Sequence, residues 1–106
     1  MTEDNLSLLY SDDTLIAALR GEIDHHSAIA IRKRIDDELF SKRPQTLTID
    51  IGEVDFMDSS GLGLIMGRLA KAREIGASLT VANPSARAAR MFKMAGLERL
   101  IQNERK

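Results

Sequence analysis

The chain has no cysteine and no tryptophan, and its aromatic residues are one tyrosine and three phenylalanines. Without cysteine, disulfide bonds and thiolate metal sites are excluded, and a reducing cytoplasm is the expected location. With so few aromatic rings, the chain lacks a platform on which bases or sugars could stack. No apolar run approaches the ~20 residues of a membrane-spanning helix, and the acidic, polar N-terminal stretch does not have the pattern of a signal peptide. We therefore expect a cytoplasmic protein without a membrane partner.

The chain also has no large excess of positive or negative charge. Fifteen Lys and Arg residues face sixteen Asp and Glu residues, for a net charge of −1. Because no dense basic stripe occurs, nucleic acid is not expected as a direct partner. The 43% of apolar residues and 29% of charged residues are typical of a globular protein, and 106 residues suffice for one hydrophobic core but not two. The sequence predicts one domain over residues 1–106.

Hydrophobic periodicity predicts alternating strands and helices. Apolar residues at every second position indicate strands, and apolar residues at intervals of three and four indicate amphipathic helices. Gly76 and Gly96 are predicted to end the second and third helices, and Asn83 and Pro84 to begin the third. The predicted order is β-β-α-β-α-β-α-β, with strands at residues 6–10, 14–20, 47–51 and 79–81, helices at residues 28–39, 61–75 and 84–95, and a last strand or docking tail at residues 97–101.

This order indicates the α/β fold class, with a mixed, mostly parallel sheet. Strands separated by helices pair in parallel through right-handed crossovers. The first two strands are joined only by Ser11, Asp12 and Asp13, a polar turn, and so form an antiparallel N-terminal hairpin. Residues 14–20 carry apolar side chains on both faces, which predicts a strand covered on both sides or nearly so.

The stretch DFMDSSGLG at residues 55–63 lies between a predicted strand and a predicted helix. Asp58, Ser59 and Ser60 are all good N-cap residues, so one reading is ordinary helix capping. The other reading is that a hydroxyl is presented to a partner. Since a helix N-terminus favours negative charge, a phosphate on Ser59 would be tolerated by its own helix, and glycines at 61 and 63 would leave the amides unshielded. Such a switch would change the surface without refolding the domain.

Other chemistries fit the sequence less well. Glycines at 61, 63 and 67 give G-x-G-x-x-x-G, one residue longer than a dinucleotide fingerprint and without a predicted strand directly before it. We interpret these glycines as contacts between helix and sheet. Ser59 with His25 or His26 and an aspartate could be drawn as a hydrolytic triad, but the G-x-S-x-G context is absent. We expect neither an enzyme nor a metal site, because adjacent histidines rarely hold one ion without further ligands.

Asp24 precedes the first predicted helix and is interpreted as its N-cap. The two histidines that follow it read as an exposed polar turn. A cap in a βα loop can also belong to a partner-contact surface, because such loops gather at one edge of a parallel sheet.

Four segments together resemble a known family. They are GEIDHH at residues 21–26, FMDSSGLG at residues 56–63, GR at residues 67–68 and MFKMAGL at residues 91–97. In this order they resemble the bacterial anti-sigma factor antagonists, single-domain members of the STAS family, with the sporulation antagonists that free the forespore sigma factor most similar. The resemblance spans nearly the whole chain.

The resemblance implies that Ser59 is phosphorylated by an anti-sigma factor that is itself a serine/threonine kinase. The unphosphorylated antagonist would bind this kinase, a sigma factor would be released, phosphorylation would end the interaction, and a serine phosphatase would reset the cycle. ATP or ADP would belong to the kinase, so no cofactor is expected here. An alternative is a STAS scaffold or lipid-transport binding module without a phosphorylation cycle. The residues expected to contact the kinase are Asp24, His25, His26, Ser27, Asp58, Ser60, Gly61, Leu62 and Gly63.

Overall fold

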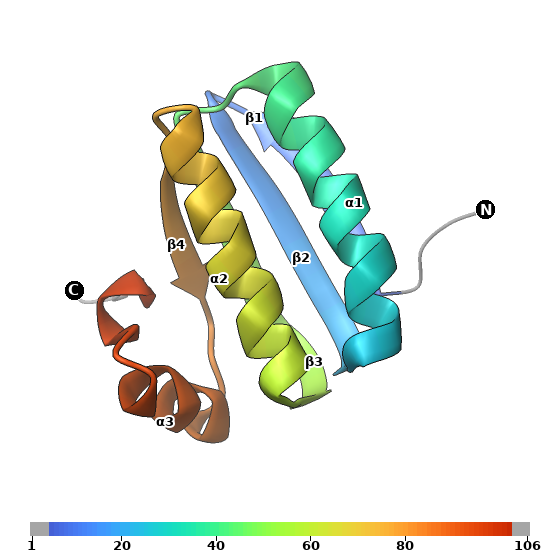
Figure 1. Cartoon of the computed structure of the whole chain (residues 1–106), viewed down its shortest axis with the longest axis vertical. Helices are drawn as coiled ribbons and strands as arrows, with labels where there is room; N and C mark the ends of the chain where they lie inside the picture. The colour runs from blue at the N-terminus through green and yellow to red at the C-terminus, as the bar shows by residue number, and fades with distance from the viewer. Residues whose placement is uncertain (1–4, 103–106) are drawn as a thin grey trace.

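The computed structural model describes residues 5–102, which form one sheet with helices packed on it (Figure 1). The described part of the chain contains four strands, three α-helices and one 3-10 helix. In chain order they are β1 (Leu6–Ser11), β2 (Thr14–Ile23), α1 (His25–Lys42), β3 (Thr46–Met57), α2 (Ser59–Glu74), β4 (Ser78–Ala82), α3 (Ala86–Met94) and η1 (Glu98–Leu100).

The sheet has the spatial order β1-β2-β3-β4. β1 and β2 pair antiparallel across a turn in which Asp12 and Asp13 have φ values of 53° and 62°. Aspartate tolerates this left-handed conformation better than most residues, so the polar turn closes the hairpin. β2 pairs with β3 and β3 with β4 in parallel. The predicted α/β class, the opening hairpin and the parallel remainder are confirmed.

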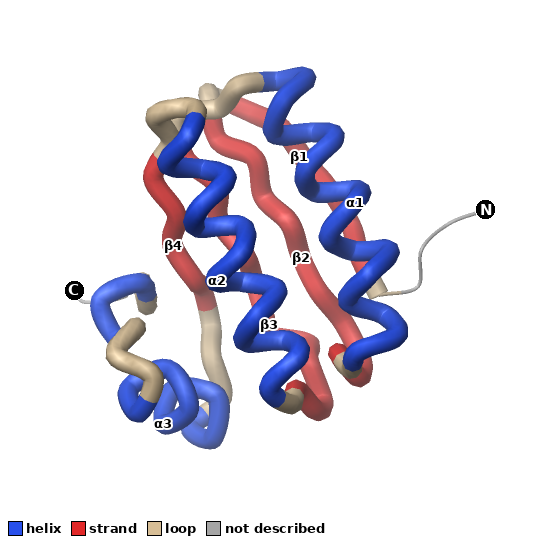
Figure 2. The backbone as a smooth tube through the Cα atoms, viewed as in Figure 1, coloured by secondary structure: helices blue, strands red, loops and turns tan. Residues whose placement is uncertain are grey.

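The molecule has two main layers. α1 and α2 run side by side over one face of the sheet, and α3 lies beyond β4 near the end where α1 and α2 begin (Figures 1 and 2). Leu15, Ala17 and Leu19 of β2 point under these helices and are buried, whereas Ile16 and Ala18 are only half-buried. The prediction that β2 is covered on both faces is therefore wrong, because no helix in the described part of the chain covers the second face.

The second face of the sheet is polar over β3 and β4. The Thr48 and Thr80 hydroxyls lie 3.2 Å apart and those of Thr46 and Ser78 lie 3.3 Å apart, in register across the two strands. Threonine and serine pairs of this kind stabilise adjacent strands while leaving the face wettable. This explains how a sheet with helices on only one face can expose the other face to solvent.

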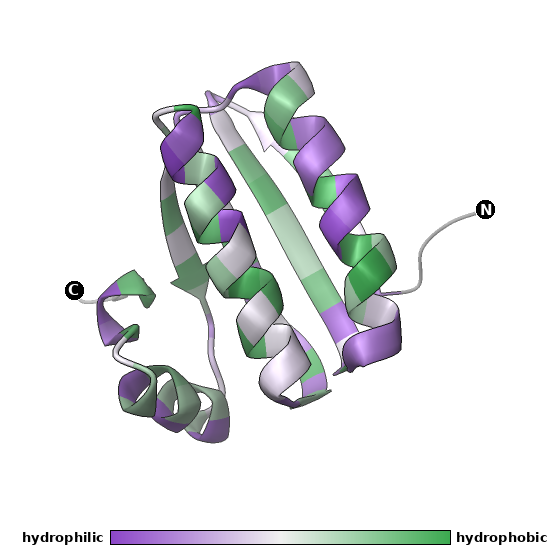
Figure 3. Cartoon of the chain, viewed as in Figure 1, coloured by the Kyte–Doolittle hydropathy of each residue, from purple (hydrophilic) through white to green (hydrophobic). Residues whose placement is uncertain are grey.

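The core lies between the sheet and the two long helices. Hydrophobic residues predominate along β2, while the helices carry both hydrophobic and hydrophilic residues (Figure 3). α1 contributes Ile31, Ile35 and Leu39 at intervals of four, all buried. This spacing keeps them on one helical face. Each buried side chain of this size is worth roughly 1.5–3 kcal/mol of transfer free energy.

The C-terminal part of the described chain differs from the prediction. The last strand is absent among residues 5–102. After α3 the chain turns through Gly96, at φ +78°, into η1, and only Ile101 makes an isolated parallel bridge, to Val81. Leu97 and Leu100 are both buried, and their i, i+3 spacing suits a 3-10 turn better than a strand. The alternative of a docking tail fits better.

The start of α3 is also shifted. Ser85, not Asn83, is its N-cap, and the Ser85 hydroxyl accepts a hydrogen bond from the Ala88 amide at 3.0 Å. Asn83 instead has φ +59°, and its amide nitrogen donates to the Asp50 carboxylate at 3.1 Å. The predicted start was two residues early because an Asn-Pro pair also suits a turn.

Candidate functional site

Two helices begin side by side because two parallel strands end in register. Ile23, the last residue of β2, pairs with Met57, the last residue of β3. Asp24 and Asp58 follow directly, and α1 and α2 start after them. Helix N-termini that follow adjacent parallel strands meet at the carboxyl edge of the sheet, where binding sites in such folds usually lie.

β3 is longer than the sequence indicated. The prediction ended it at Ile51, but the strand continues to Met57, directly before the Asp58 cap. Two register shifts against β2 interrupt the regular pairing, between Ala18 and Arg20 and between Gly21 and Glu22. Such irregularities break the alternation of buried and exposed residues, so the strand could not be followed from its pattern. A strand thus does precede this stretch, and its expected absence was a wrong reason to reject a dinucleotide fingerprint. The G-x-G-x-x-x-G spacing of the glycines still differs from that fingerprint.

Asp24 caps α1, as predicted. Its carboxylate accepts a hydrogen bond from the Ser27 amide at 2.9 Å, and the Ser27 hydroxyl lies 3.0 Å from the Asp24 amide, which donates to it. This reciprocal pair is a capping box. The hydrogen bond from the Ser27 amide lowers the pKa of Asp24 below its usual value, against a smaller opposing effect of burial. Ser27 is thus committed to the cap, while the adjacent His25 and His26 are exposed.

Asp58 caps α2, so the capping interpretation of this stretch is confirmed for one residue. Its carboxylate accepts a hydrogen bond from the Ser60 amide at 2.8 Å. Ser59 occupies the first helical position and is exposed, and its hydroxyl makes no hydrogen bond within residues 5–102. Ser60 is half-buried. Of the two serines, the first is the one that a partner can reach more easily.

The glycines after these serines do not act alike. Gly61 is buried, and a Cβ there would overlap the Met57 side chain and approach Ile23 Cγ2 to 3.3 Å. The absence of a side chain at 61 therefore lets α2 approach the strand ends, and the expectation that Gly61 leaves amides open to an anion is wrong. A Cβ at Gly63 or Gly67 would meet nothing within 4 Å, so packing does not explain these two. Leu62 is half-buried against the core.

An open groove runs between the first turns of α1 and α2. His25 and Arg32 line it from α1, and Ser60, Gly63 and Gly67 line it from α2. The small residues on α2 lower one wall, because nothing projects beyond the helix backbone there. The structure thus brings His25, Ser60 and Gly63 of the predicted contact set to one surface. His26 and Leu62 do not line the groove, and Gly61 faces the interior.

Besides Ala28, two residues of α1 outside the predicted contact set line this groove. They are Ile29, which is 51% exposed, and Arg32. Their spacing from His25, four and seven residues, places all three on one helical face. This spacing could have been recognised in the sequence, and an exposed isoleucine on that helical face indicates a contact surface.

Arg68 of α2 also lines the groove but is buried, and its Nε lies 2.8 Å from the Asp36 carboxylate of α1. Its NH1 also lies 3.5 Å from the Leu64 carbonyl oxygen. Burial lowers the pKa of Arg68 most, and the nearby positive charge of Arg32 lowers it further, while Asp36 opposes this shift. An arginine that has lost its hydration needs such a partner. This ion pair connects the two walls of the groove.

Among residues 5–102, none of the helices has the length and hydropathy that a membrane span requires. Within the same residues, no group of three or more His, Asp or Glu side chains is arranged to hold a metal ion. The two histidines and Asp24 are therefore not assembled into a cluster of that kind.

The STAS domain profile matches residues 5–106. The chain belongs to the STAS domain family. Its curated relatives include an anti-sigma F factor antagonist from Lysinibacillus sphaericus, 33% identical over 85 residues that cover 80% of this chain and 73% of the relative. An anti-sigma-B factor antagonist from Bacillus subtilis (strain 168) is 30% identical over 97 residues, 92% of this chain and 87% of the relative.

Solved structures agree with this assignment. The STAS domain matches the anti-sigma factor antagonist SpoIIAA in its unphosphorylated form with a TM-score of 0.84 and 28% identity, over 95% of this chain and 89% of the other. It matches the phosphorylated form of the Bacillus protein SpoIIAA with a TM-score of 0.78 and 28% identity, over 95% of this chain and 92% of the other. The resemblance to the anti-sigma factor antagonists is confirmed, and so is the STAS fold.

Proposed function

We propose that this STAS domain is an anti-sigma factor antagonist that is switched by phosphorylation at Ser59. In its unphosphorylated form it binds an anti-sigma factor serine kinase, which then releases its sigma factor. The proposal rests on the position of Ser59. This residue is exposed at the first position of α2, and its hydroxyl forms no hydrogen bond within the described part of the chain. The relatives that are anti-sigma factor antagonists support the partner class.

The kinase-facing surface comprises the two helix starts and the groove between them. Asp24, His25 and Ser27 lie at one helix start, and Asp58, Ser59 and Ser60 at the other. His26 is exposed on the same turn, and Gly63 opens the wall of α2. Gly61 and Leu62 contribute by holding α2 against the strand ends, not by direct contact.

In phosphorylation the Ser59 oxygen forms a bond to the γ-phosphorus of the kinase-bound ATP, the bond from that phosphorus to the β-phosphate oxygen breaks, ADP leaves, and the hydroxyl proton is released. The new dianion sits at a helix N-terminus, which favours negative charge, so the domain keeps its fold. The same phosphate destabilises the complex with a partner that carries a carboxylate nearby. A phosphate about 6 Å from a partner carboxylate is repelled by roughly 3 kcal/mol per unit-charge pair at an effective dielectric constant of 20. That weakens binding about a hundredfold.

The remaining parts of the cycle follow from this chemistry. A phosphate ester on serine is stable, so a separate serine phosphatase has to restore the hydroxyl. The nucleotide belongs to the kinase, and the antagonist itself performs no catalysis and needs no cofactor. A cytoplasmic location fits such a cycle, because the sigma factor acts on RNA polymerase there.

The decisive experiment is incubation of the purified protein with ATP and each anti-sigma factor kinase from the same genome, followed by mass mapping of the modified residue. We expect one phosphate, on Ser59, and loss of the kinase complex as the phosphate accumulates. A Ser60→Ala variant should still receive its phosphate on Ser59, which distinguishes the two adjacent serines. If no kinase modifies Ser59 and complexes persist regardless of ATP, the protein is a STAS scaffold or a lipid-transport binding module instead.

A further inference from the structure

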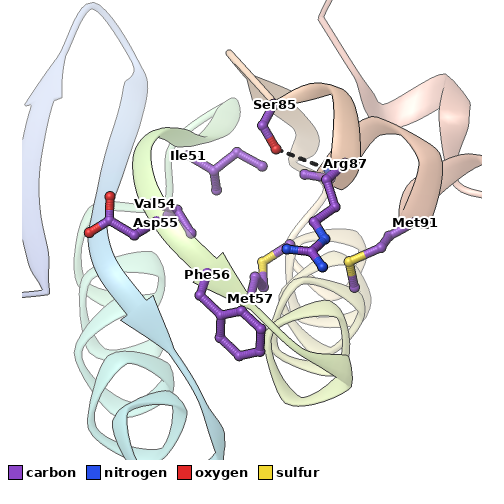
Figure 4. Close-up of a pocket in the computed structure, with 9 residues that line it drawn as sticks. Ile51, Val54, Asp55, Phe56, Met57, Ser85, Arg87 and Met91 are labelled. Carbon is purple, nitrogen blue, oxygen red and sulfur yellow. Dashed lines mark hydrogen bonds between the residues drawn. The ribbon is translucent and has the colours of Figure 1, made fainter.

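A second pocket, which shares no lining residue with the α1–α2 groove, lies where the end of β3 meets α3. This pocket is small, and Figure 4 shows its lining. Phe56 and Met57 come from β3, and Arg87 and Met91 from α3. None of the residues that line this pocket also lines the groove beside Ser59. The kinase-facing surface therefore does not account for it.

The exposed stripe of α3 combines positive charge with soft apolar side chains. Arg87, Arg90, Met91 and Met94 follow one another at intervals of three, one and three, which places them on one helical face. Both arginines are exposed, Met91 is half-buried and Met94 is 87% exposed. Methionine side chains adapt to partner surfaces and are frequent at binding sites.

The cations on this helix have no carboxylate partner in the described part of the chain. α3 contains no acidic residue, and Arg87, Arg90 and Lys93 make no ion pair within residues 5–102. Asp55 also lines the pocket, but its carboxylate points away from Arg87, whose guanidinium extends between Met57 and Met91 (Figure 4). In a chain with a net charge of −1, this is a local concentration of unpaired positive charge.

The size of the pocket limits what can enter it. The cavity volume is about 30 Å³, whereas sites for small-molecule ligands occupy roughly 300–1,000 Å³. The pocket therefore accepts the end of one side chain and not a metabolite. Phe56, 45% exposed at its rim, would be covered by the same contact.

A bilayer is a poor match for this surface. Amphipathic helices that lie on membranes expose a continuous apolar face. In α3 the apolar face contains Ala88 and Phe92 and is buried in the domain, and on the other side the half-buried Met91 and the exposed Met94 lie beside two arginines. An apolar pocket beside unpaired arginines suits a protein segment better, since such a segment can supply one apolar anchor with carboxylates around it.

We propose that the pocket between β3 and α3 is a second docking surface, which binds an acidic protein segment through one leucine-like side chain and flanking carboxylates. The side chain enters beside Met57 and Met91, and the carboxylates pair with Arg87 and Arg90. This surface gives the STAS domain a contact for a partner other than the kinase at Ser59.

The test uses the full chain labelled with [methyl-¹³C]methionine and a short peptide in which leucines stand among glutamates. Met57 and Met91 line the pocket, and the exposed Met66 on α2 is an internal reference outside it. We expect the methyl signals of Met57 and Met91 to shift in a saturable manner while that of Met66 stays unchanged. Peptides with lysine for glutamate, or with alanine for leucine, should not cause these shifts.

Variants and vesicles complete the test. Arg87→Glu should weaken binding of the acidic peptide at least about tenfold, as loss of a central charged contact does, and Arg34→Glu, an equal charge change on exposed α1, should change it less than about twofold. Both positions are exposed, so the fold should be retained, and unchanged Met66 signals in the free proteins check this. Absence of saturable shifts, equal binding of the alanine peptide, or equal weakening by Arg34→Glu overturns the proposal. Shifts caused by phosphatidylglycerol vesicles but not by the peptide also overturn it, in favour of a lipid surface.

Discussion

The Nε atom of Arg68 on α2 lies 2.8 Å from the Oδ1 atom of Asp36 on α1. Only 4% of the Arg68 side chain is exposed, against 21% of the Asp36 side chain. The two residues are far apart in sequence, and their ion pair spans the interface between the two helices whose first turns form the candidate site. This ion pair therefore links the two helices at the groove, which Arg68 itself lines.

The first prediction concerns this ion pair. Asp36→Ala should lower the free energy of unfolding by roughly 2 kcal/mol, less than the ~3–5 of a fully buried pair because water reaches part of the site. Arg68→Leu should be milder, since Asp36 can then be hydrated and no buried charge is left. Urea denaturation measures both changes. The matched control is Asp37→Ala, which breaks the exposed Lys33–Asp37 pair at 3.2 Å and should change stability by less than about 0.5 kcal/mol. Equal effects of Asp36→Ala and Asp37→Ala would contradict the prediction.

The second prediction compares the effects on stability of alanine substitutions at two glycines of α2. Gly61→Ala places a methyl group against Met57 and Ile23, and overpacking of this kind typically costs about 1–3 kcal/mol. Gly67→Ala meets open space and should stabilise the helix by up to about 1 kcal/mol, because alanine is the better helix former. The midpoints of urea unfolding should therefore move in opposite directions. If both variants gain stability, Met57 yields to the new methyl group and the packing role of Gly61 is wrong.

The third prediction concerns pH. The pKa of Asp24 is lowered in the folded protein, chiefly by the hydrogen bond from the Ser27 amide, from an ordinary value of 3.8. A lowered folded-state pKa means that this carboxylate adds stability above pH 3.8, and that the gain disappears as the pH falls through the folded-state value. An asparagine side chain at this position would keep the cap but could not titrate, so the Tm difference between the wild type and Asp24→Asn should shrink from about pH 7 to about pH 2. A difference that is constant over this range would exclude the effect.

The fourth prediction concerns the proposed switch. Ser59→Asp adds one negative charge and should weaken binding to the cognate kinase about a hundredfold, as one unit-charge repulsion of roughly 3 kcal/mol implies. Ser59→Ala should bind as tightly as the unmodified protein and stay bound when ATP is added. Isothermal titration with the purified kinase measures both affinities. An unchanged affinity for Ser59→Asp would argue against the switch, and equal Tm values of the three proteins would show that the domain itself is undisturbed.

The sequence predicted most of the fold because local patterns carried the information. Asp24 and Asp58 were recognised as cap candidates from their residue type, and Gly76 and Gly96 as helix stops because only glycine adopts the left-handed conformation with ease. The predictions that failed depend on neighbours distant in sequence. The extension of β3 to Met57 requires pairing with β2, and the 3-10 turn at residues 98–100 follows from where Leu97 and Leu100 find a core.

The sequence alone determined that this chain forms alternating strands and helices and that an acid and two serines stand where the second helix begins, since capping and periodicity act over a few residues. Tertiary structure decided which of those groups reach solvent. The pairing of Ile23 with Met57 sets the two helix starts side by side, the nearby Met57 side chain leaves no room for a Cβ at Gly61, and Asp36 pairs with Arg68 across the interface. These outcomes depend on distances between segments remote in the chain, and such distances exist only once the sheet and helices have packed.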